Sequence, residues 1–185
     1  MIVLASKSPR RKELMHRICG DFLIDVSDID ESLSLNLSPI EAVKDIAKRK
    51  GVEVSKRHKN DLVISADTIV VIDNLIIGKP VDKKDAKRIL RLLSNRTHQV
   101  ITAFCLFKED YFYEEYVISK VTFNRLNDEM IDAYIETGSP MDKAGAYGYQ
   151  DNHDFALVKS IEGSVDNVIG FPVKEIQNAI EKIKN

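Results

Sequence analysis

The sequence has few of the features that mark disulfide-rich, zinc-ribbon or membrane proteins. Its two cysteines, Cys19 and Cys105, are far apart and form no CxxC pair, so neither a disulfide framework nor a zinc ribbon is indicated. No run approaches the roughly 18 apolar residues of a membrane-spanning helix, and the apolar segment 1–5 is too short for the core of a signal peptide. We therefore expect a protein of the reducing cytoplasm.

Several common catalytic signatures are also missing. The four histidines make no metal-spaced pair, and the sequence contains no GxSxG motif, no Cys–His nucleophile arrangement and no Walker A motif. These absences disfavour a covalent mechanism and a P-loop ATPase. Water activated by a carboxylate, with or without a metal ion, is the chemistry that is left.

Positive and negative charges nearly cancel. There are 27 Lys and Arg residues against 29 Asp and Glu residues, which gives a net charge of -2. Bulk attraction to a nucleic acid or an anionic membrane is therefore not expected, and an anionic partner must be met by a local cluster of cations. With 185 residues, 44% hydrophobic and 30% charged, and no repeat or low-complexity tract, we expect one compact α/β domain over residues 1–185.

Capping residues and apolar runs predict alternating strands and helices. Helices are expected after the capping residues Ser8, Ser38 and Asp82, with the cations of 48–50 in the last turns of the second one. Two more helices are expected at 128–136 and 173–184. Strands are expected at 2–5, 22–26, 62–72, 98–107, 112–123, 155–158 and 165–168, with a tight hairpin turn at 73–74.

A cationic turn follows the first apolar run. Ser8 can cap a helix that begins at Pro9, so free backbone N–H groups and the side chains of Arg10 and Arg11 meet at one point. Cations oppose the positive end of a helix dipole, and an anion between the two arginines removes the conflict. Because guanidinium groups bind phosphate oxygens in pairs, a phosphate chain is the expected anion. The alternative is a capped helix start whose arginines are simply solvated.

Asp67 is an acid inside the otherwise apolar run 62–72. Acids are rarely buried unless they are paired, so its place in the sequence needs a reason. One interpretation is a carboxylate at a strand end that accepts hydrogen bonds from nearby backbone. The other is a general base or a metal ligand, because partial burial makes a carboxylate a better proton acceptor and a divalent cation uses its charge directly.

Three weaker signals accompany Asp67. The acidic residues Asp28, Asp30 and Glu31 of one loop can gather as hard oxygen ligands for Mg²⁺, although a solvated acidic loop is the more common explanation for such a trio. Lys79 lies between glycine and proline at the end of an apolar hairpin, a position that aims its side chain and favours a functional role. For Lys50, a surface lysine and a functional lysine are both left open. Gln150 follows a glycine-interrupted loop, and its amide can donate and accept at once, as contact with a base edge requires.

Taken together, these segments resemble the Maf family of nucleotide pyrophosphatases. The blocks that carry the resemblance are LASKSPRRKEL at 4–14, ADTIVV at 66–71, GKP at 78–80, DKAGAYG at 142–148 with Gln150, and Gly170-Phe171-Pro172. In this order and at these spacings they cover nearly the whole chain.

The resemblance implies a fold and a reaction. The fold is α/β, with an elongated mixed sheet, flanking helices and two lobes around a central cleft, similar to that of inosine triphosphate pyrophosphatases. The reaction is hydrolysis of a nucleoside triphosphate between its α and β phosphates with a divalent metal, Mg²⁺ or Mn²⁺. The proton acceptor of the family falls on Asp67, which we expect to share the metal with Glu31. The other functional positions fall on Ser6, Arg10, Arg11, Lys50, Thr68, Lys79 and Gln150.

Three positions that tune base specificity in the family favour pyrimidines. The branch that is similar at Arg10, Thr68 and Gln150 acts on dTTP and UTP, whereas the branch acting on 7-methyl-GTP has tryptophan, glutamine and glutamate there. One departure concerns this choice, because Asp151 stands where family members usually have glycine. A modified pyrimidine triphosphate is therefore kept as a further possible substrate.

A different class of function is also considered. The alternative is a regulator of cell division that senses a nucleotide without significant turnover, in keeping with the family's link to septum formation. The resemblance suggests a homodimer, and the expected partner is a small nucleoside triphosphate rather than a nucleic acid or a membrane.

Overall fold

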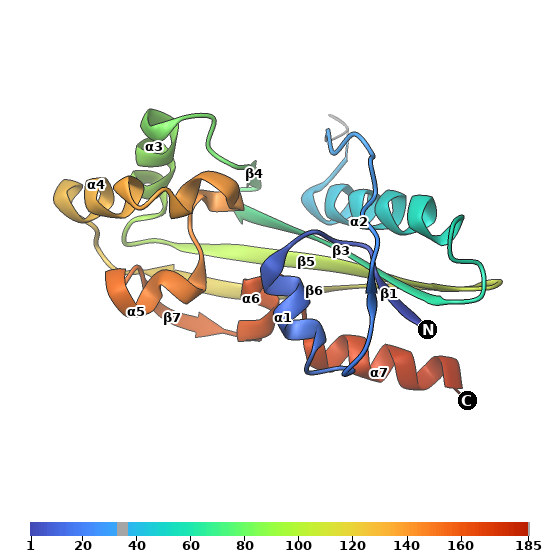
Figure 1. Cartoon of the computed structure of the whole chain (residues 1–185). Helices are drawn as coiled ribbons and strands as arrows, with labels where there is room; N and C mark the ends of the chain where they lie inside the picture. Colours follow the sequence, from blue (N-terminus) through green and yellow to red (C-terminus); the bar gives the residue numbers. More distant parts are fainter. Residues whose placement is uncertain (33–36, 185) are drawn as a thin grey trace. The chain divides into compact units, whose positions relative to one another are not determined.

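The computed structural model describes residues 1–32 and 37–184 as a mixed α/β protein with flanking helices (Figure 1). Its strands are β1 (Ile2–Leu4), β2 (Leu23–Ile24), β3 (Leu62–Ile72), β4 (Leu75–Ile77), β5 (Thr97–Lys108), β6 (Tyr111–Phe123) and β7 (Val158–Glu162). Its helices are α1 (Pro9–Met15), α2 (Pro39–Ser55), α3 (Lys83–Leu93), α4 (Asp128–Glu136), α5 (Asn152–Phe155), α6 (Val165–Ile169) and α7 (Val173–Lys184).

The described strands form one open, seven-stranded sheet in the order β2-β1-β3-β5-β6-β7, with β4 paired to β3. β1 pairs in parallel with both β2 and β3, in a register that places Leu4 beside Ile64. β4 and β7 pair antiparallel with β3 and β6. The expected mixed α/β fold is confirmed, while the central cleft stays a prediction.

The chain divides into two compact units. The first comprises Met1–Thr68, Thr102–Val117 and Gly170–Asn185, and the second comprises Ile69–Ile101 and Ile118–Ile169. Each has its own apolar cluster, one beneath α2 in the first unit and a larger one around α3 and α4 in the second. In the described parts of the chain, no helix is both long enough and apolar enough to span a membrane.

Two predicted helix starts in the first unit are confirmed. Ser8 Oγ accepts a hydrogen bond from the backbone N–H of Arg11, and Pro9 follows as the first helical residue of α1. Ser38 and Glu41 form a reciprocal capping box at the start of α2. These short-range bonds satisfy backbone donors that the first turn of a helix leaves unpaired.

The extent of α2 differs from the prediction. The helix continues through Gly51 to Ser55, so Lys50 lies inside it and not in its last turn, which holds no basic residue. A glycine inside a helix normally weakens it, but a Cβ at Gly51 would lie 2.1 Å from Cε2 of Phe107 and 2.5 Å from Oγ of Ser65. Gly51 therefore lets α2 lie directly against β3 and β5.

In the second unit, the predicted hairpin turn is confirmed, and two strands predicted near the end of the unit are wrong. Asp73 and Asn74 have φ of 51° and 61°, which confirms the predicted tight turn. The predicted strand at 155–158 is wrong, because α5 ends at Phe155 and β7 begins only at Val158. The predicted strand at 165–168 is also wrong, because this segment is α6.

Side-chain hydrogen bonds explain the second error. Ser164 Oγ accepts the backbone N–H of Asn167, as a helix cap does. The buried amide of Asn167 then donates to the carbonyl of Val100 and to Oγ of Ser119. The segment Val165–Ile169 thus forms a helical turn that is bonded to neighbouring strands.

The close approach at Gly51 generates a stability prediction. We expect Gly51→Ala to lower the free energy of unfolding by about 1–2 kcal/mol, because the added methyl group overpacks against Phe107 and Ser65 by more than the gain in helix propensity. Gly20→Ala is the matched control, since a Cβ at Gly20 meets nothing within 4 Å. Urea unfolding of the purified variants provides the measurement. An equal midpoint for the two variants would contradict this account of α2 packing.

Candidate active site

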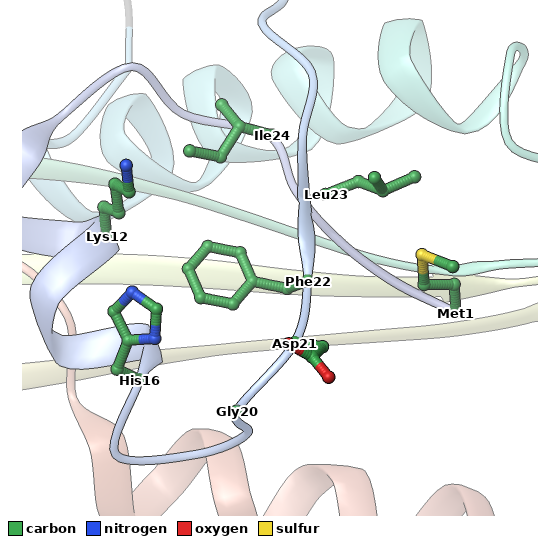
Figure 2. Close-up of a pocket in the computed structure, with 8 residues that line it drawn as sticks. All are labelled: Met1, Lys12, His16, Gly20, Asp21, Phe22, Leu23 and Ile24. Atoms are coloured by element: carbon green, nitrogen blue, oxygen red, sulfur yellow. The ribbon is translucent and has the colours of Figure 1, made fainter.

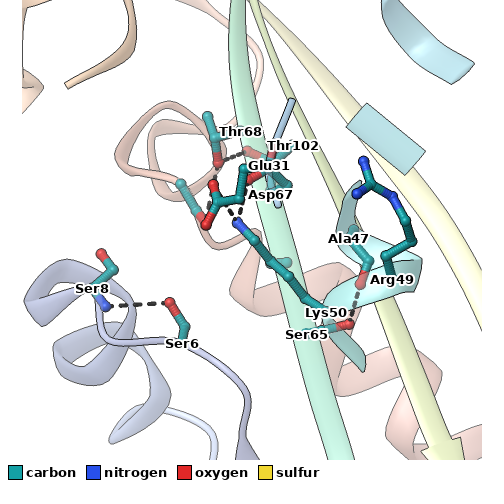
Figure 3. A network of polar contacts seen from close by, with 12 residues as sticks. Ser6, Ser8, Glu31, Ala47, Arg49, Lys50, Ser65, Asp67, Thr68 and Thr102 are labelled. Atoms are coloured by element: carbon teal, nitrogen blue, oxygen red, sulfur yellow. Dashed lines mark hydrogen bonds and ion pairs between the residues drawn. The ribbon is translucent and has the colours of Figure 1, made fainter. Parts of the chain in front are cut away.

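The centre of the candidate site is an ion pair between β3 and α2. Asp67 is 8% exposed and Lys50 is 7% exposed, and Lys50 Nζ lies 2.8 Å from Oδ1 of Asp67. The same ammonium lies 3.0 Å from Oε2 of Glu31 in the loop before α2 (Figure 3). One cation therefore serves two carboxylates, and the buried charge of Asp67 is paired.

The pleat of β3 explains why Asp67 faces α2. Side chains two residues apart leave the same face of a strand. Ser65 donates from Oγ to the carbonyl of Ala47 in α2 at 2.7 Å, and Asp67 meets Lys50 one helical turn further along (Figure 3). Thr68 leaves the opposite face, where it meets α1.

The carboxylate pair is a suitable donor set for a hard divalent cation. Among residues 1–32 and 37–184, no three His, Cys, Asp or Glu side chains gather in a group that could hold a metal ion by themselves. Asp67 and Glu31 nevertheless hold a positive group between their oxygens. Mg²⁺ is commonly bound by one or two carboxylates together with substrate phosphates and water, so this pair fits that mode of binding.

Arg11 ties three segments of the first unit together. Its Nε donates to the carbonyl of Gly170 at 2.9 Å, Nη1 donates to the carbonyl of Ala66 at 2.8 Å, and Nη2 donates to Oγ1 of Thr68 at 3.0 Å. Nη1 also reaches Oγ of Ser6 at 3.4 Å. Burial lowers the pKa of the Arg11 guanidinium, and the negative charge of Asp67 opposes that shift. At least four of its five N–H groups thus point to protein acceptors.

The hydroxyl of Thr68 lies inside this cluster. It is 3.0 Å from Oγ1 of Thr102, which is fully buried in β5. Gly170, with a φ of 113°, lies beside the side chains of Thr68 and Arg11, and a Cβ there would lie 3.2 Å from Oγ1 of Thr68. Only glycine adopts this backbone conformation without strain, so the turn before α7 is shaped to fit Thr68 and Arg11.

Two further predicted residues belong to the start of α1. Ser6 is 7% exposed, and its Oγ accepts the backbone N–H of Ser8 at 3.2 Å. Arg10 is half-buried in the first turn of the helix, next to Arg11. The two adjacent arginines therefore differ, because the contacts of Arg11 bind it into the protein framework.

The second unit contains the other two predicted residues. Gly78 accepts a hydrogen bond at its carbonyl from the backbone N–H of Gly145 at 3.1 Å, which joins the end of the β4 hairpin to the loop 143–150. Lys79 directly follows Gly78 and is exposed, and Gln150 is exposed at the other end of that loop. The fold thus brings Lys79 to the loop that carries Gln150, as parts of one unit.

The structure brings most of the predicted residues of the first unit into contact. Ser6, Arg11 and Thr68 share one hydrogen-bonded cluster, and Glu31, Lys50 and Asp67 share the other. Sequence reasoning missed Thr102, although a hydroxyl in the apolar run of β5 is the same kind of signal that identified Asp67. The role of Gly170 was also missed, since it depends on contacts with Thr68 and Arg11.

A separate hollow lies beside β2 (Figure 2). The rings of Phe22 and His16 lie close together there, with centroids 4.9 Å apart and planes tilted by 59°, and Lys12 lies on the same side. Leu23 points away on the other side of the strand (Figure 2). None of the predicted site residues lines this hollow, so we place the candidate site at Asp67.

The contacts of Arg11 predict a difference between the two arginines of α1. We expect Arg11→Lys to lower the free energy of unfolding by about 2–4 kcal/mol, because one ammonium cannot satisfy acceptors at Gly170, Ala66 and Thr68 together. Arg10→Lys is the matched control and is expected to change it by less than about 0.5 kcal/mol. Urea unfolding monitored by circular dichroism measures both. A larger loss of unfolding free energy for Arg10→Lys than for Arg11→Lys would show that Arg11 does not hold these segments together.

Comparison with known proteins identifies relatives along the whole chain. The sequence is 42% identical over 183 residues to a dTTP/UTP pyrophosphatase of Bacillus pumilus (strain SAFR-032), covering 97% of this chain and 95% of the relative. It is 45% identical over 174 residues to a dTTP/UTP pyrophosphatase of Thermococcus onnurineus (strain NA1), covering 94% of this chain and 93% of the relative.

Solved structures support the fold and a family model supports the family. A HAM1 protein from Coxiella burnetii superposes with a TM-score of 0.53 at 14% identity, covering 98% of each chain, and the Staphylococcus aureus Ham1 protein with a TM-score of 0.51 at 13% identity, again covering 98% of each. The model described as "Maf-like protein" matches residues 1–183. The chain therefore belongs to the Maf family.

Proposed function

We propose that this protein is a nucleoside triphosphate pyrophosphatase that hydrolyses dTTP and UTP to the monophosphate and pyrophosphate. The observation that carries the proposal is the buried carboxylate of Asp67, which is paired with Lys50 and has Arg11 of α1 bonded to both of its chain neighbours, Ala66 and Thr68. The names of the relatives supply the substrate class.

The chemistry assigned to Asp67 is removal of a proton from water. The water oxygen forms a bond to the α-phosphorus, its proton passes to the Asp67 carboxylate, and the bond to the bridging oxygen breaks. The leaving pyrophosphate takes the electron pair and carries increasing negative charge. Lys50, whose ammonium lies within 3.0 Å of both carboxylates, would stabilise that charge.

A divalent metal, Mg²⁺ or Mn²⁺, is part of the proposal. Glu31 and Asp67 would hold it, and the ion when bound would neutralise phosphate oxygens. The protein meanwhile keeps Asp67 in place through β3 and Lys50 through α2. Because only two carboxylates contribute, the nucleotide phosphates are expected to supply further ligands.

The other predicted residues receive distinct proposed roles. Arg10 holds the phosphate chain, with Lys79 as a further phosphate ligand suggested by the family resemblance. Ser6 and Arg11 shape the phosphate-binding turn. Thr68 and Gln150 contact the pyrimidine edge, again on the resemblance.

We also propose the setting in which the enzyme works. The whole chain, residues 1–185, is taken as one pyrophosphatase domain that works as a homodimer in the cytoplasm. Cys19 and Cys105 are both free thiols, which suits a reducing compartment.

A pyrophosphate-release assay with dTTP, UTP and CTP tests the activity. We expect release from dTTP and UTP, and a fall of about 10²–10⁴-fold in kcat for Asp67→Asn with nucleotide affinity largely kept, because an amide cannot accept the proton. Asp110→Asn, in an exposed turn, is the matched control and should leave kcat unchanged. Binding without release by the wild-type protein would favour the nucleotide-sensing regulator. Turnover by Asp67→Asn within threefold of wild type would remove the role of Asp67.

Metal removal provides a second test. Dialysis against EDTA is expected to abolish release from dTTP, and added Mg²⁺ should restore it. Glu31→Gln is expected to raise the Mg²⁺ concentration for half-maximal rate about tenfold, because a neutral amide is a poorer ligand than a carboxylate. Glu109→Gln, in the exposed β5–β6 turn, is the control. Mn²⁺ binding with nucleotide present, followed by electron paramagnetic resonance, gives a readout apart from turnover. Unchanged binding in Glu31→Gln would contradict the ligand assignment.

A further inference from the structure

The carboxylate that follows Gln150 is turned into the protein. Oδ2 of Asp151 accepts a hydrogen bond from the hydroxyl of Tyr134 at 2.6 Å and another from Oγ of Ser139 at 2.7 Å. Its charge is therefore committed to two hydroxyl groups of its own unit.

Tyr134 holds both sides of Gln150. It is fully buried in α4, and its hydroxyl oxygen accepts the backbone N–H of Gly148 at 3.1 Å while its proton goes to Asp151. The backbone N–H of Asp151 also donates to the carbonyl of Gly148 at 3.1 Å. Burial, followed by the nearby Asp151 carboxylate, raises the pKa of Tyr134, so the phenol stays a neutral donor. One hydroxyl thus fixes residues 148 and 151 on either side of residue 150.

The amide of Gln150 lies in space that Gly148 leaves open. A Cβ at Gly148 would lie 2.6 Å from Nε2 of Gln150 and 2.8 Å from its Oε1. The amide therefore lies directly beside the backbone of Gly148. Moving Gly148 or Asp151 would move the group that is assigned to base contact.

The same network extends to the beginning of the loop. Lys143 is 7% exposed, and its Nζ donates to the carbonyl of Ser139 at 2.5 Å and to Ser139 Oγ at 3.0 Å. Ser139 in turn donates to Asp151. Both ends of the segment 139–151 are consequently connected through side chains and not through the backbone alone.

We propose that Tyr134 and Asp151 are positioning residues that set pyrimidine selectivity by fixing the amide of Gln150. The inference rests on the proposed function for its substrate, since it assumes that Gln150 contacts the base. It does not require either residue to touch the nucleotide.

Two variants of Asp151 separate an acceptor from a charge. Both hydroxyls donate to the same oxygen, Oδ2, so the amide oxygen of Asn can accept both bonds, whereas Ala can accept neither. We expect Asp151→Ala to raise KM for dTTP about tenfold, with kcat changed less than threefold, and to reduce the preference for dTTP over CTP about tenfold. Asp151→Asn is expected to retain most of the wild-type values. Equal loss in both variants, or no loss in Asp151→Ala, would overturn the proposal.

A double-mutant cycle tests whether Tyr134 acts through Gln150. Tyr134→Phe is expected to reduce the dTTP-to-CTP ratio of kcat/KM about tenfold in the wild-type background and to have no further effect in Gln150→Ala. Tyr116→Phe removes the hydroxyl of a half-exposed tyrosine and is the matched control. The variants are compared only after near-ultraviolet circular dichroism has shown that each is folded. A full additional loss in the Gln150→Ala background would contradict the assignment.

A readout without turnover distinguishes this proposal from the proposed function. The side-chain NH₂ signal of Gln150 can be identified in a ¹⁵N spectrum by its disappearance in Gln150→Ala. We expect its heteronuclear NOE to fall in Asp151→Ala and to stay near the wild-type value in Asp151→Asn. If the wild-type protein released no pyrophosphate but this pattern held, the proposed function would fail while the positioning role stood. An unchanged NOE in Asp151→Ala would remove the positioning role, whatever the activity.

Discussion

A charged carboxylate inside an apolar strand needs a cation, and the first unit is arranged around that need. β3 is buried along almost its whole length, so Asp67 has little access to water. Lys50 supplies the positive charge from α2, which therefore has to pack against β3 next to Asp67. The hydrogen bond from Ser65 to the carbonyl of Ala47 fixes α2 against β3 at this point. Glu31 meets the same ammonium from the preceding loop. A single charge therefore positions a strand, a helix and a loop.

Arg11 plays a complementary part along the same stretch of β3. Its guanidinium joins the start of α1 to Ala66 and Thr68 of β3 and to the turn at Gly170. The two cations of the site thus have different roles. Lys50 balances the negative charge of Asp67, and Arg11 holds three chain segments together by hydrogen bonds. A nearly neutral chain can build a polarised site because these charges are placed by packing and not by their number.

Sequence reasoning was sufficient where the decisive contacts are local and failed where they are distant. The capping box at Ser38 is set within four residues, and it was predicted correctly. The segment 165–168 is too short for periodicity to assign, and it is helical in the structure, where the buried amide of Asn167 bonds to two neighbouring strands. Asp67 stood out as an acid among apolar residues. The partners of Asp151 come from another helix and another turn, and no local pattern announces them.

The missing side chain of Gly148 has a consequence for protein engineering. Because the amide of Gln150 occupies the space that a side chain at 148 would fill, the two positions form one structural module with Asp151 and Tyr134. Under the proposed role of Gln150, replacing residue 150 alone to change the nucleobase preference would leave the surrounding backbone in an arrangement that fits glutamine. Libraries that vary residues 134, 148, 150 and 151 together allow this backbone to be reshaped. The group at position 151 that accepts hydrogen bonds from the two hydroxyls can then be varied as well.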